Sequence, residues 1–365
     1  MTSQIVHYNL DNIDNLNALF NLIIGERSNG KSYQVKHKKA VLKYLETGRR
    51  FVLVRRWKEE ISSEKIEQYF QDVDIFKITE GKYNCITMYR KQLFLSNYNN
   101  ENGKITRGEK IGYVVALSTE QNYAGASYLD VDDIIFEEFM ARDTPYLSNE
   151  ATRLINLYST IDRKRGTTRL WMVGNSITQV CPYLYDWDLQ NIVLNQKQGT
   201  IETIYLSTGS FDDEGNEIKI KCCIEYCADT GRSSFAIGKH KDMLNKGTWQ
   251  SDPQPHLPKS YNLYKMMFRC GFEYQGFRFI GEVLIDKKDL CWFIYPYKKE
   301  FKKKFLVFSD IIKPTRYYQR NIYNITINNP KLTNVLNTFR EGQIFYCSDL
   351  VGTNFKQAID FEIRR

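Results

Sequence analysis

The stretch that decides the fold of this chain is Ile23-Ile24-Gly25-Glu26-Arg27-Ser28-Asn29-Gly30-Lys31-Ser32. It closes an apolar run that predicts a short buried strand, and it leads into residues 32–42, whose apolar spacing predicts a helix. The pattern G-x-x-x-x-G-K-S between a strand and a helix is that of a P-loop. The sequence therefore predicts a nucleotide-binding site here, against the alternative of an accidental glycine-rich turn.

Each residue type in this motif has a physical role. Gly25 and Gly30 are expected to adopt backbone angles that side chains forbid, so that successive N–H groups turn toward a polyphosphate. The positive end of the following helix points at the same anion. Lys31 would reach the β- and γ-phosphates, and the Ser32 hydroxyl would be a ligand of Mg²⁺. ATP and Mg²⁺ are therefore the expected cofactors.

A second apolar strand is predicted over residues 50–54, and it is followed by the cations Arg55, Arg56 and Lys58. In an open α/β sheet the carboxyl ends of the strands face the ligand crevice. These three side chains are therefore candidates to reach phosphate or DNA. The alternative is that they are ordinary surface cations.

Residues 131–139, Val-Asp-Asp-Ile-Ile-Phe-Glu-Glu-Phe, form an apolar strand that ends in two acids. Downstream of a P-loop this is a Walker B pattern. Glu137 would hold Mg²⁺ through water, and Glu138 would act as the general base on the attacking water. Most such enzymes have aspartate at the first position, and the alternative here is a strand that ends in solvated acids.

The next predicted strand, residues 170–175, ends in Asn175. An amide at this point fits a sensor that reads the γ-phosphate or positions the water. A P-loop strand, two further strands, an acid-ending strand and an asparagine-ending strand, in that order, describe the additional-strand catalytic-glutamate class of P-loop ATPases. The predicted fold class is therefore α/β for the N-terminal part of the chain.

Length and composition predict more than one domain. The chain has 365 residues, which is long for a single core. We expect a P-loop ATPase domain over residues 1–193, a small linker domain over 194–257 and an α+β domain over 258–365. The sequence contains neither a transmembrane stretch nor a leader at its N-terminus. The 8 cysteines are therefore expected to be thiols in a reducing compartment.

The positive charge is concentrated in the C-terminal third. Residues 258–365 contain 19 Lys and Arg against 10 Asp and Glu, or +9, whereas the rest of the chain has 32 against 33, or −1. Such a concentration is typical of a surface that contacts the nucleic-acid backbone. Lys302, Lys303 and Lys304 are the candidate DNA contacts, and the alternative is a solvated basic face.

Together these motifs resemble the genome-packaging ATPases of the small protein-primed tailed phages, the phi-twenty-nine group (Picovirinae). The resemblance covers residues 19 to 183 and weakens to architecture alone further on. The residues that carry it are Ile24, Gly25, Arg27, Gly30, Lys31, Ser32 and Tyr33; Val54, Arg55, Arg56 and Lys58; Phe136, Glu137, Glu138 and Phe139; Asn149 and Glu150; Leu157, Arg163 and Arg165; and Asn175, Pro182 and Tyr183.

The resemblance implies a ring of identical subunits that docks on the portal of a procapsid in the host cytoplasm and drives double-stranded DNA inward. A scaffold RNA is left open as a further partner. By position, Arg163 matches the family's arginine finger, which is given to a neighbour's ATP. The nucleotide site would include Gly25, Arg27, Gly30, Lys31, Ser32 and Tyr33. The C-terminal domain would be RNase H-like with its nuclease acids lost.

Two features depart from the family's pattern, and two rival hypotheses stay open. Glu137 replaces the usual aspartate, and residues 119–125 lack the lysine expected there as a second trans-acting cation. One rival is a terminase-like ATPase with an active nuclease, for which the candidate acids are Glu282, Asp286, Asp289 and Asp310. The other is a DNA-binding or capsid-docking module with a degenerate nucleotide site.

Overall fold

The computed structural model describes residues 8–141, 146–176, 178–229, 249, 252–287, 289–302, 304–311, 313, 317–319, 322 and 332–363. The chain divides into two compact units. Unit 1 contains the described residues up to 176 and those from 191 to 229, and unit 2 contains residues 178–190 and the described residues from 249 onward.

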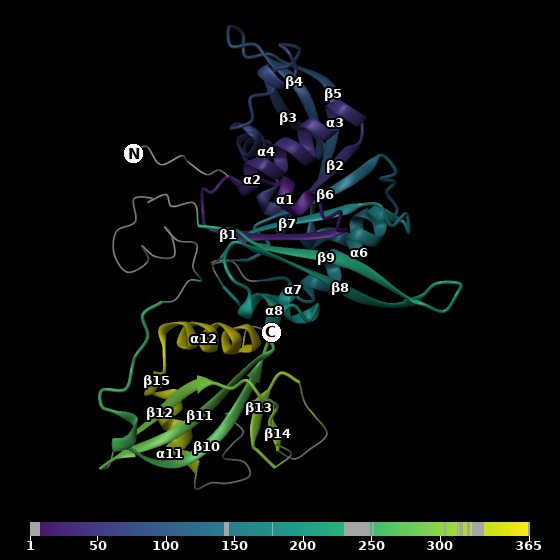
Figure 1. The fold of residues 1–365 in the computed structure, drawn as a ribbon. Helices are drawn as coiled ribbons and strands as arrows, with labels where there is room; N and C mark the ends of the chain where they lie inside the picture. Colours follow the sequence, from purple (N-terminus) through teal and green to yellow (C-terminus); the bar gives the residue numbers. More distant parts are fainter. Residues whose placement is uncertain are drawn as a thin grey trace, which may run out of the picture. The chain divides into compact units, whose positions relative to one another are not determined.

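Unit 1 is built on a sheet in the order β3-β4-β5-β2-β6-β7-β1-β9-β8 (Figure 1). The six adjacent strands from β5 to β9 in this order run parallel, and β3, β4 and β8 are antiparallel to their neighbours. The strands are β1 (Phe20–Gly25), β2 (Arg50–Arg55), β3 (Cys85–Tyr89), β4 (Gln92–Tyr98), β5 (Ile105–Ala116), β6 (Val131–Glu137), β7 (Arg169–Asn175), β8 (Thr200–Phe211) and β9 (Glu217–Tyr226).

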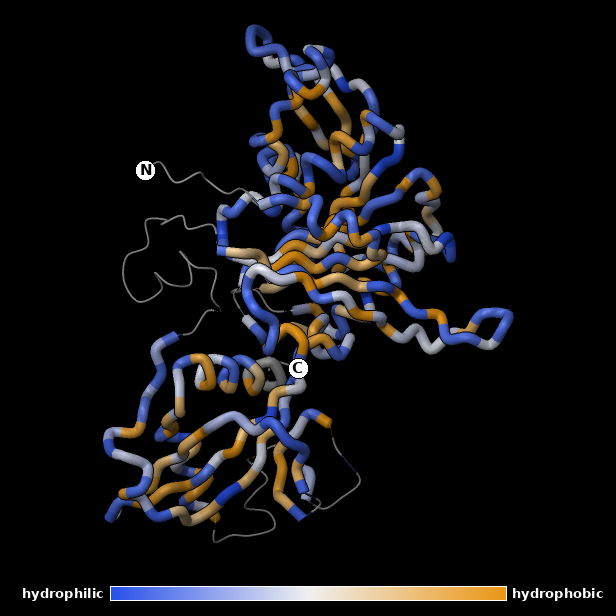
Figure 2. The backbone as a smooth tube through the Cα atoms, viewed as in Figure 1, coloured by the Kyte–Doolittle hydropathy of each residue, from blue (hydrophilic) through white to orange (hydrophobic). Residues whose placement is uncertain are grey.

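The central strands are buried along their whole length because both faces of a parallel sheet are covered. All six residues of β1 are buried, and Figure 2 shows hydrophobic residues concentrated in the middle of this sheet. The helical elements of unit 1 are α1 (Asp11–Asp14), α2 (Lys31–Val35), η1 (Lys36–Leu42), α3 (Lys43–Thr47), η2 (Lys58–Glu60), α4 (Ser63–Phe70), α5 (Ile75–Ile78), η3 (Leu117–Tyr123), α6 (Glu150–Asp162) and, apart from its first residue, α8 (Gln190–Asn195).

The helix after the P-loop is longer than predicted. It runs without a break through α2, the π-helical segment η1 and α3, and it ends at Gly48, whose φ of +70° is typical of a helix C-terminus. The predicted class is confirmed by the strand order, since β7 lies between the P-loop strand β1 and the acid-ending strand β6.

The expected boundaries at 193/194 and 257/258 differ from the structure. Residues 178–190, including α7 (Pro182–Asp186), belong to unit 2. Strands β8 and β9 then return to unit 1, where β9 pairs in parallel with β1. The hairpin therefore completes the sheet of unit 1 rather than forming a linker domain of its own. The polar turn of the hairpin, Asp212 to Asn216, has the composition of a linker. The other end of the hairpin is buried and places Cys222 and Cys223 in the core.

Unit 2 is an α+β domain. Its sheet has the order β14-β13-β10-β11-β12-β15 (Figure 1), with an antiparallel meander of β10, β11 and β12 and parallel pairing of the outer strands. The elements are η4 (Tyr261–Leu263), β10 (Lys265–Tyr274), β11 (Phe277–Asp286), β12 (Asp289–Pro296), β13 (Val307–Ser309), β14 (Tyr318–Gln319), α11 (Thr333–Arg340), β15 (Ile344–Tyr346) and α12 (Asp349–Ile363).

The core of unit 2 lies between this sheet and its two helices. Phe272 on β10 contacts Phe339 of α11 and Phe355 of α12, with ring centroids 6.1 and 5.1 Å apart. The α+β prediction is therefore confirmed, while the RNase H-like assignment stays a prediction. Within the described residues no helix is long and apolar enough to cross a membrane.

Candidate nucleotide-binding site

The P-loop turns at Gly30, whose φ of +95° lies in the left-handed region that favours glycine. Gly25 is required for a different reason than the predicted backbone angle. A Cβ atom added to it would lie 2.7 Å from Cβ of Cys227, which follows the neighbouring strand β9. Close packing of β9 against the loop, rather than a special φ, therefore excludes a side chain at residue 25.

Lys31 and Asn175, two of the predicted site residues, contact each other. The Lys31 ammonium donates to the Asn175 Oδ1 at 2.7 Å and to the carbonyl oxygen of Glu26 at 2.6 Å. Lys31 is only 4% exposed, and burial lowers its pKa to about 8. The Lys31 ammonium thus bonds to a backbone oxygen of the P-loop and to the side-chain amide of the last residue of β7.

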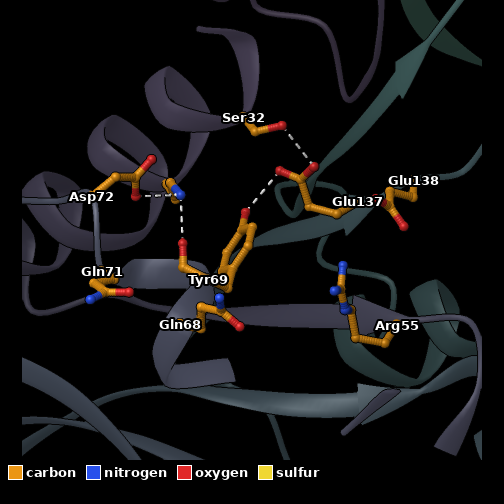
Figure 3. A pocket seen from close by; sticks show the side chains of 9 residues that line it. Ser32, Arg55, Gln68, Tyr69, Gln71, Asp72, Glu137 and Glu138 are labelled. Atoms are coloured by element: carbon orange, nitrogen blue, oxygen red, sulfur yellow. Dashed lines mark hydrogen bonds and ion pairs between the residues drawn. The ribbon is translucent and has the colours of Figure 1, made fainter. Parts of the chain in front are cut away.

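Ser32 and Glu137 also contact each other, although β7 lies between β1, the strand before the P-loop, and β6, the strand that ends in Glu137. The Ser32 hydroxyl donates to Glu137 Oε2 at 3.0 Å, and the Tyr69 hydroxyl donates to Oε1 at 2.8 Å (Figure 3). Burial raises the pKa of Glu137, and these two hydrogen bonds oppose the rise. Burial also raises the pKa of Tyr69 well above its usual value. Tyr69 lies on α4 outside any motif, so no pattern in the sequence could have indicated it.

The oxygen atoms of Ser32 and Glu137 suit a magnesium ion. Mg²⁺ prefers hydroxyl, carboxylate and water oxygens, and it is usually held by one or two carboxylates together with substrate phosphates. One hydroxyl and one carboxylate at hydrogen-bond distance beside the P-loop form such a set. The glutamate at residue 137 is therefore long enough to reach the position that an aspartate usually serves.

These groups open into a pocket of about 560 Å³. Glu138 lines it directly after β6, with a φ of +56°. A residue other than glycine in that region costs about 1–3 kcal/mol, and such strain persists where the surroundings impose it. The lining residues are Ser32, Lys36, Arg55, Gln68, Tyr69, Gln71, Asp72, Glu137 and Glu138.

Arg55 lies in this pocket rather than on a DNA-facing surface. Figure 3 shows its guanidinium directed toward Glu137 and Glu138, and its carbon Cζ is 5.8 Å from the centre of the Tyr69 ring. Its Nε atom is buried without a hydrogen-bond partner among the described residues. Of the two predicted alternatives, phosphate and DNA, this position favours phosphate.

The predicted DNA contact by Arg56 is wrong. Arg56 is 3% exposed and pairs with Glu150, with Nε 2.9 Å from a carboxylate oxygen. Alternation along an extended segment turns it away from the pocket that Arg55 faces, into the interior. Lys58, three residues after Arg55, is exposed, and its DNA contact stays a prediction.

The remaining predicted residues of this unit lie at the surface or on the P-loop helix. Arg163 is exposed at the C-terminal end of α6, where Nη2 donates to the carbonyl oxygen of Ala126 at 2.7 Å. It does not line the pocket of its own chain. Arg27 is exposed, and Tyr33 stacks on His37 with ring centroids 5.4 Å apart.

In unit 2, a loop anchored by aromatic rings carries the candidate DNA-binding lysines. Phe301 stacks between Tyr297 and Phe305, with ring centroids 5.0 and 5.5 Å apart. Lys302 and Lys304 are exposed on this loop, whereas Lys303 lies outside the described residues. Their contact with DNA stays a prediction.

The candidate nuclease acids are dispersed. Glu282 accepts from Tyr295 at 2.8 Å and pairs with Arg269 at 3.1 Å, and Asp286 pairs with Lys259. Asp310, whose pKa is raised by burial, accepts from the Gln275 N–H at 2.9 Å. Asp289 is exposed. In the part of the chain that the structure describes, no group of three or more His, Cys, Asp or Glu residues is arranged to hold a metal.

One acid on the first strand of unit 2 was missed. Strand β10 includes Glu273, which is not among the four candidate acids named from the sequence. In the sheet, Glu273 lies opposite Ser309 of β13, and Asp310 follows Ser309 in the chain. The Glu273 carboxylate is held by Arg278 at 2.8 Å and lies 3.8 Å from the Lys313 ammonium, and its charge contributes to the raised pKa of the neighbouring Asp310.

Cysteines 222, 223 and 227 are buried free thiols on and beside β9. Burial raises the pKa of Cys227 to about 12. These three side chains are therefore thiols, as the sequence predicts, and they are packed in the core of unit 1.

Comparison with known proteins places the site in a family context. The family model for the Podovirus DNA encapsidation protein (Gp16) matches residues 2–207. The DNA packaging protein of Bacillus phage B103 is 31% identical over 173 residues, which are 45% of this chain and 46% of that protein. The DNA packaging protein of Bacillus phage phi29 is 27% identical over 184 residues, half of each chain. The matches thus span about half the length of these curated relatives.

Among solved structures, a chain of the bacteriophage Phi-29 viral genome packaging motor assembly superposes with a TM-score of 0.55. The likeness covers 98% of this chain and 99% of that one at 20% sequence identity. At this identity the comparison bears on the fold, which both chains share over both units.

Proposed function

Because this chain belongs to the podovirus DNA encapsidation protein (Gp16) family, we propose that it is an ATPase that drives double-stranded DNA into a viral procapsid. The observation that carries the proposal is the contact between the Ser32 hydroxyl and the Glu137 carboxylate, with Glu138 next in the chain on the wall of the same pocket. This arrangement supports metal-assisted ATP hydrolysis, in which positioning and charge neutralisation do most of the work.

In this proposal the residues of the P-loop bind the nucleotide. Lys31 exchanges the Glu26 carbonyl and the Asn175 amide for phosphate oxygens. Asn175 is then free to orient the γ-phosphate or the attacking water. Ser32 and Glu137 would hold Mg²⁺, which when bound neutralises phosphate charge.

Three further groups act at the chemical step. Glu138 accepts a proton from the attacking water as general base. Arg55, which is aimed into the pocket and whose Nε has no hydrogen-bond partner in the described part of the chain, adds a cation from the same chain. Arg163, exposed and outside its own pocket, would be supplied to the ATP of a neighbouring copy.

The proposed partners follow from the family's packaging role. They are double-stranded DNA, other copies of this chain in a ring, and the portal of a procapsid in the host cell. The basic balance of residues 258–365, +9, supports a DNA contact in unit 2.

ATP hydrolysis measured with and without double-stranded DNA tests the proposal. We expect magnesium-dependent hydrolysis that DNA stimulates, and Ser32→Ala and Glu137→Gln should each abolish it. An active protein whose rate is unchanged in both variants would contradict the site, and a protein that binds DNA but never hydrolyses ATP would favour the docking-module alternative.

A further inference from the structure

The backbone directly after β6 is held by a buried arginine. The Arg56 guanidinium donates through Nη1 to the carbonyl oxygen of Glu138 at 3.1 Å and through Nη2 to that of Phe139 at 2.7 Å. Glu138 therefore has its side chain on the wall of the nucleotide pocket and its carbonyl bonded to a residue that does not line that pocket.

The charge of Arg56 is balanced by Glu150, the first residue of α6. Nε of Arg56 lies 2.9 Å from each carboxylate oxygen, and Glu150 is 0% exposed. Glu150 Oε2 also accepts from the Leu147 N–H at 2.7 Å. A rigid, planar guanidinium can bond the carboxylate and both carbonyl oxygens at once, which a lysine ammonium on a flexible stem cannot reproduce.

The second side of this peptide is fixed by packing. The Phe139 ring is fully buried against Gly174, where an added Cβ would lie 2.8 Å from the ring. Gly174 directly precedes Asn175, the last residue of β7. The left-handed φ of Glu138 is thus imposed from one side by Arg56 and from the other by the strand that carries the sensor.

We propose that the Arg56–Glu150 ion pair positions Glu138, so that both residues act in ATP turnover without touching the nucleotide. The inference rests on the proposed function, in which Glu138 is the general base. Loss of the pair would allow the peptide after Glu138 to leave its left-handed conformation and carry the carboxylate away from the attacking water. The alternative is that the pair only stabilises the fold.

The two alternatives differ in what they do to folded protein. A positioning role predicts a lower kcat with nucleotide affinity retained, because Lys31, Ser32 and Glu137 are untouched. A misplacement of about 1 Å in a reacting group costs about a hundredfold in rate. A purely structural role predicts lower thermal stability with an unchanged kcat for the molecules that remain folded.

The experiment compares Glu150→Gln and Arg56→Lys with the parental chain. We expect kcat to fall about 10- to 100-fold, while the Kd for a fluorescent ATP analogue changes less than about twofold. Asp133→Asn is the matched control, because Asp133 is also a buried carboxylate, paired with Lys43 at 2.5 Å, and it lies on β6 four residues before the end that leads to Glu138. It should lower the melting temperature and leave kcat unchanged.

The slow residual rate of single-turnover hydrolysis in a Glu138→Gln background, followed over long incubation, separates direct from indirect effects. If the pair acts through Glu138, Glu150→Gln should add no further loss there, whereas independent effects would multiply. Should the single variants fail to fold, Arg56→Met with Glu150→Met removes both charges and leaves no unpaired ion in the interior. That double variant should fold, bind nucleotide and turn over slowly.

The outcomes distinguish the positioning role of the ion pair from the proposed function. An active parental protein with Glu150→Gln and Arg56→Lys at the parental kcat overturns the positioning role and leaves the proposed function intact. A parental protein without ATPase activity, or a Glu138→Gln variant with full activity, overturns the proposed function itself.

Discussion

Single residues of the site are expected to change their partners when nucleotide binds. Lys31 is buried and bonded to a carbonyl and an amide, so nucleotide phosphates would replace neutral acceptors by charged ones. In the proposed function, Glu138 acts only at the chemical step, as the general base. The two residues are therefore expected to fail differently.

Lys31→Ala and Glu138→Gln should both stop turnover, by separable routes. The first removes phosphate binding, so the Kd for ATP should rise together with the loss of rate. The second neutralises the general base only, so ATP should stay bound and unhydrolysed. Equilibrium binding and single-turnover measurements on both variants check this. Parental turnover in Glu138→Gln would refute the Walker B assignment.

Glu225 gives the fold a pH dependence that is separate from the site. Its carboxylate accepts from the Tyr8 hydroxyl at 2.7 Å, and burial raises its pKa to about 7, against about 4.3 in an unfolded chain. The native state therefore binds the extra proton between these values. The associated stability is present below about pH 4 and is lost as pH rises through about 7.

Glu225→Gln should remove this dependence while keeping an oxygen acceptor for Tyr8. In urea titrations, the parental free energy of unfolding should fall relative to the variant by up to about 3 kcal/mol between about pH 4.5 and pH 8. Glu202→Gln, an exposed substitution on the neighbouring strand β8, is the control and should follow the parental protein. Parallel curves for parental protein and Glu225→Gln would count against the assignment.

At the scale of elements, the sequence predicted what motifs and periodicity encode. The sequence predicts the strand before the P-loop, the acid-ending strand β6 and the asparagine-ending strand β7, each with functional residues at or after its end. This is possible because a buried parallel strand is a continuous apolar run in the sequence. The roles of Arg55 and Arg56 could not be predicted. Which of two successive cations faces a pocket and which faces the interior depends on where β2 ends, and charge alone does not reveal it.

Long-range pairing was the second limit. The β8–β9 hairpin joins the sheet beside β1 through contacts about 200 residues apart in sequence, such as Phe20 with Cys222. Its local composition, with an exposed polar turn, gave no indication of that partner. Tyr69 and Glu150 were missed as site residues for the same reason, since their partners Glu137 and Arg56 lie far away in the chain.

Helix α6 links the two kinds of contact that the proposed motor needs. Glu150 at its start bonds Arg56 behind Glu138, and Arg163 follows its end at the surface. If Arg163 serves a neighbour's ATP, it is worth about three to five orders of magnitude in rate. Arg163→Ala alone should therefore be nearly inactive.

Mixing Arg163→Ala subunits with Glu138→Gln subunits should restore part of the activity. At one type of interface the intact Glu138 of the first faces the intact Arg163 of the second. Lys31→Ala mixed with Glu138→Gln is the control and should not recover, because both lesions lie on the nucleotide-binding side of the same interface. Absence of recovery across a full mixing series, with mixed rings verified by mass measurement, would argue against donation in trans.

At the scale of the whole molecule, charge and chemistry are divided between the two units. Unit 1 contains the nucleotide pocket, and the sequence from residue 258 onward carries the excess of +9. A packaging motor must hold DNA of any sequence, which backbone contacts provide. Such contacts release counterions, so affinity should fall steeply with salt.

Replacing Lys302, Lys303 and Lys304 by Ala should weaken binding to double-stranded DNA and flatten its salt dependence. Each lost phosphate contact removes about 0.9 from the slope of log affinity against log salt, or about 2.7 for all three. Lys65, Lys77 and Lys104, exposed in unit 1, provide a triple-alanine control with the same loss of net charge. Equal effects of both triple variants would favour general attraction over a defined surface.

The acids of unit 2 predict that the protein holds DNA without cutting it. A two-metal nuclease needs several carboxylates around its ions, whereas Glu273 is bonded to Arg278 and Asp310 to the Gln275 N–H. Supercoiled DNA incubated with the full chain and Mn²⁺ should therefore remain supercoiled. Nicking that disappears when Glu273 and Asp310 are both changed to Ala, but persists when the more distant Asp286 is changed to Ala, would show that Arg278 yields its place to metal. The chain would then be a terminase-like ATPase with an active nuclease, and its basic surface would guide DNA to the nuclease site as well as hold it.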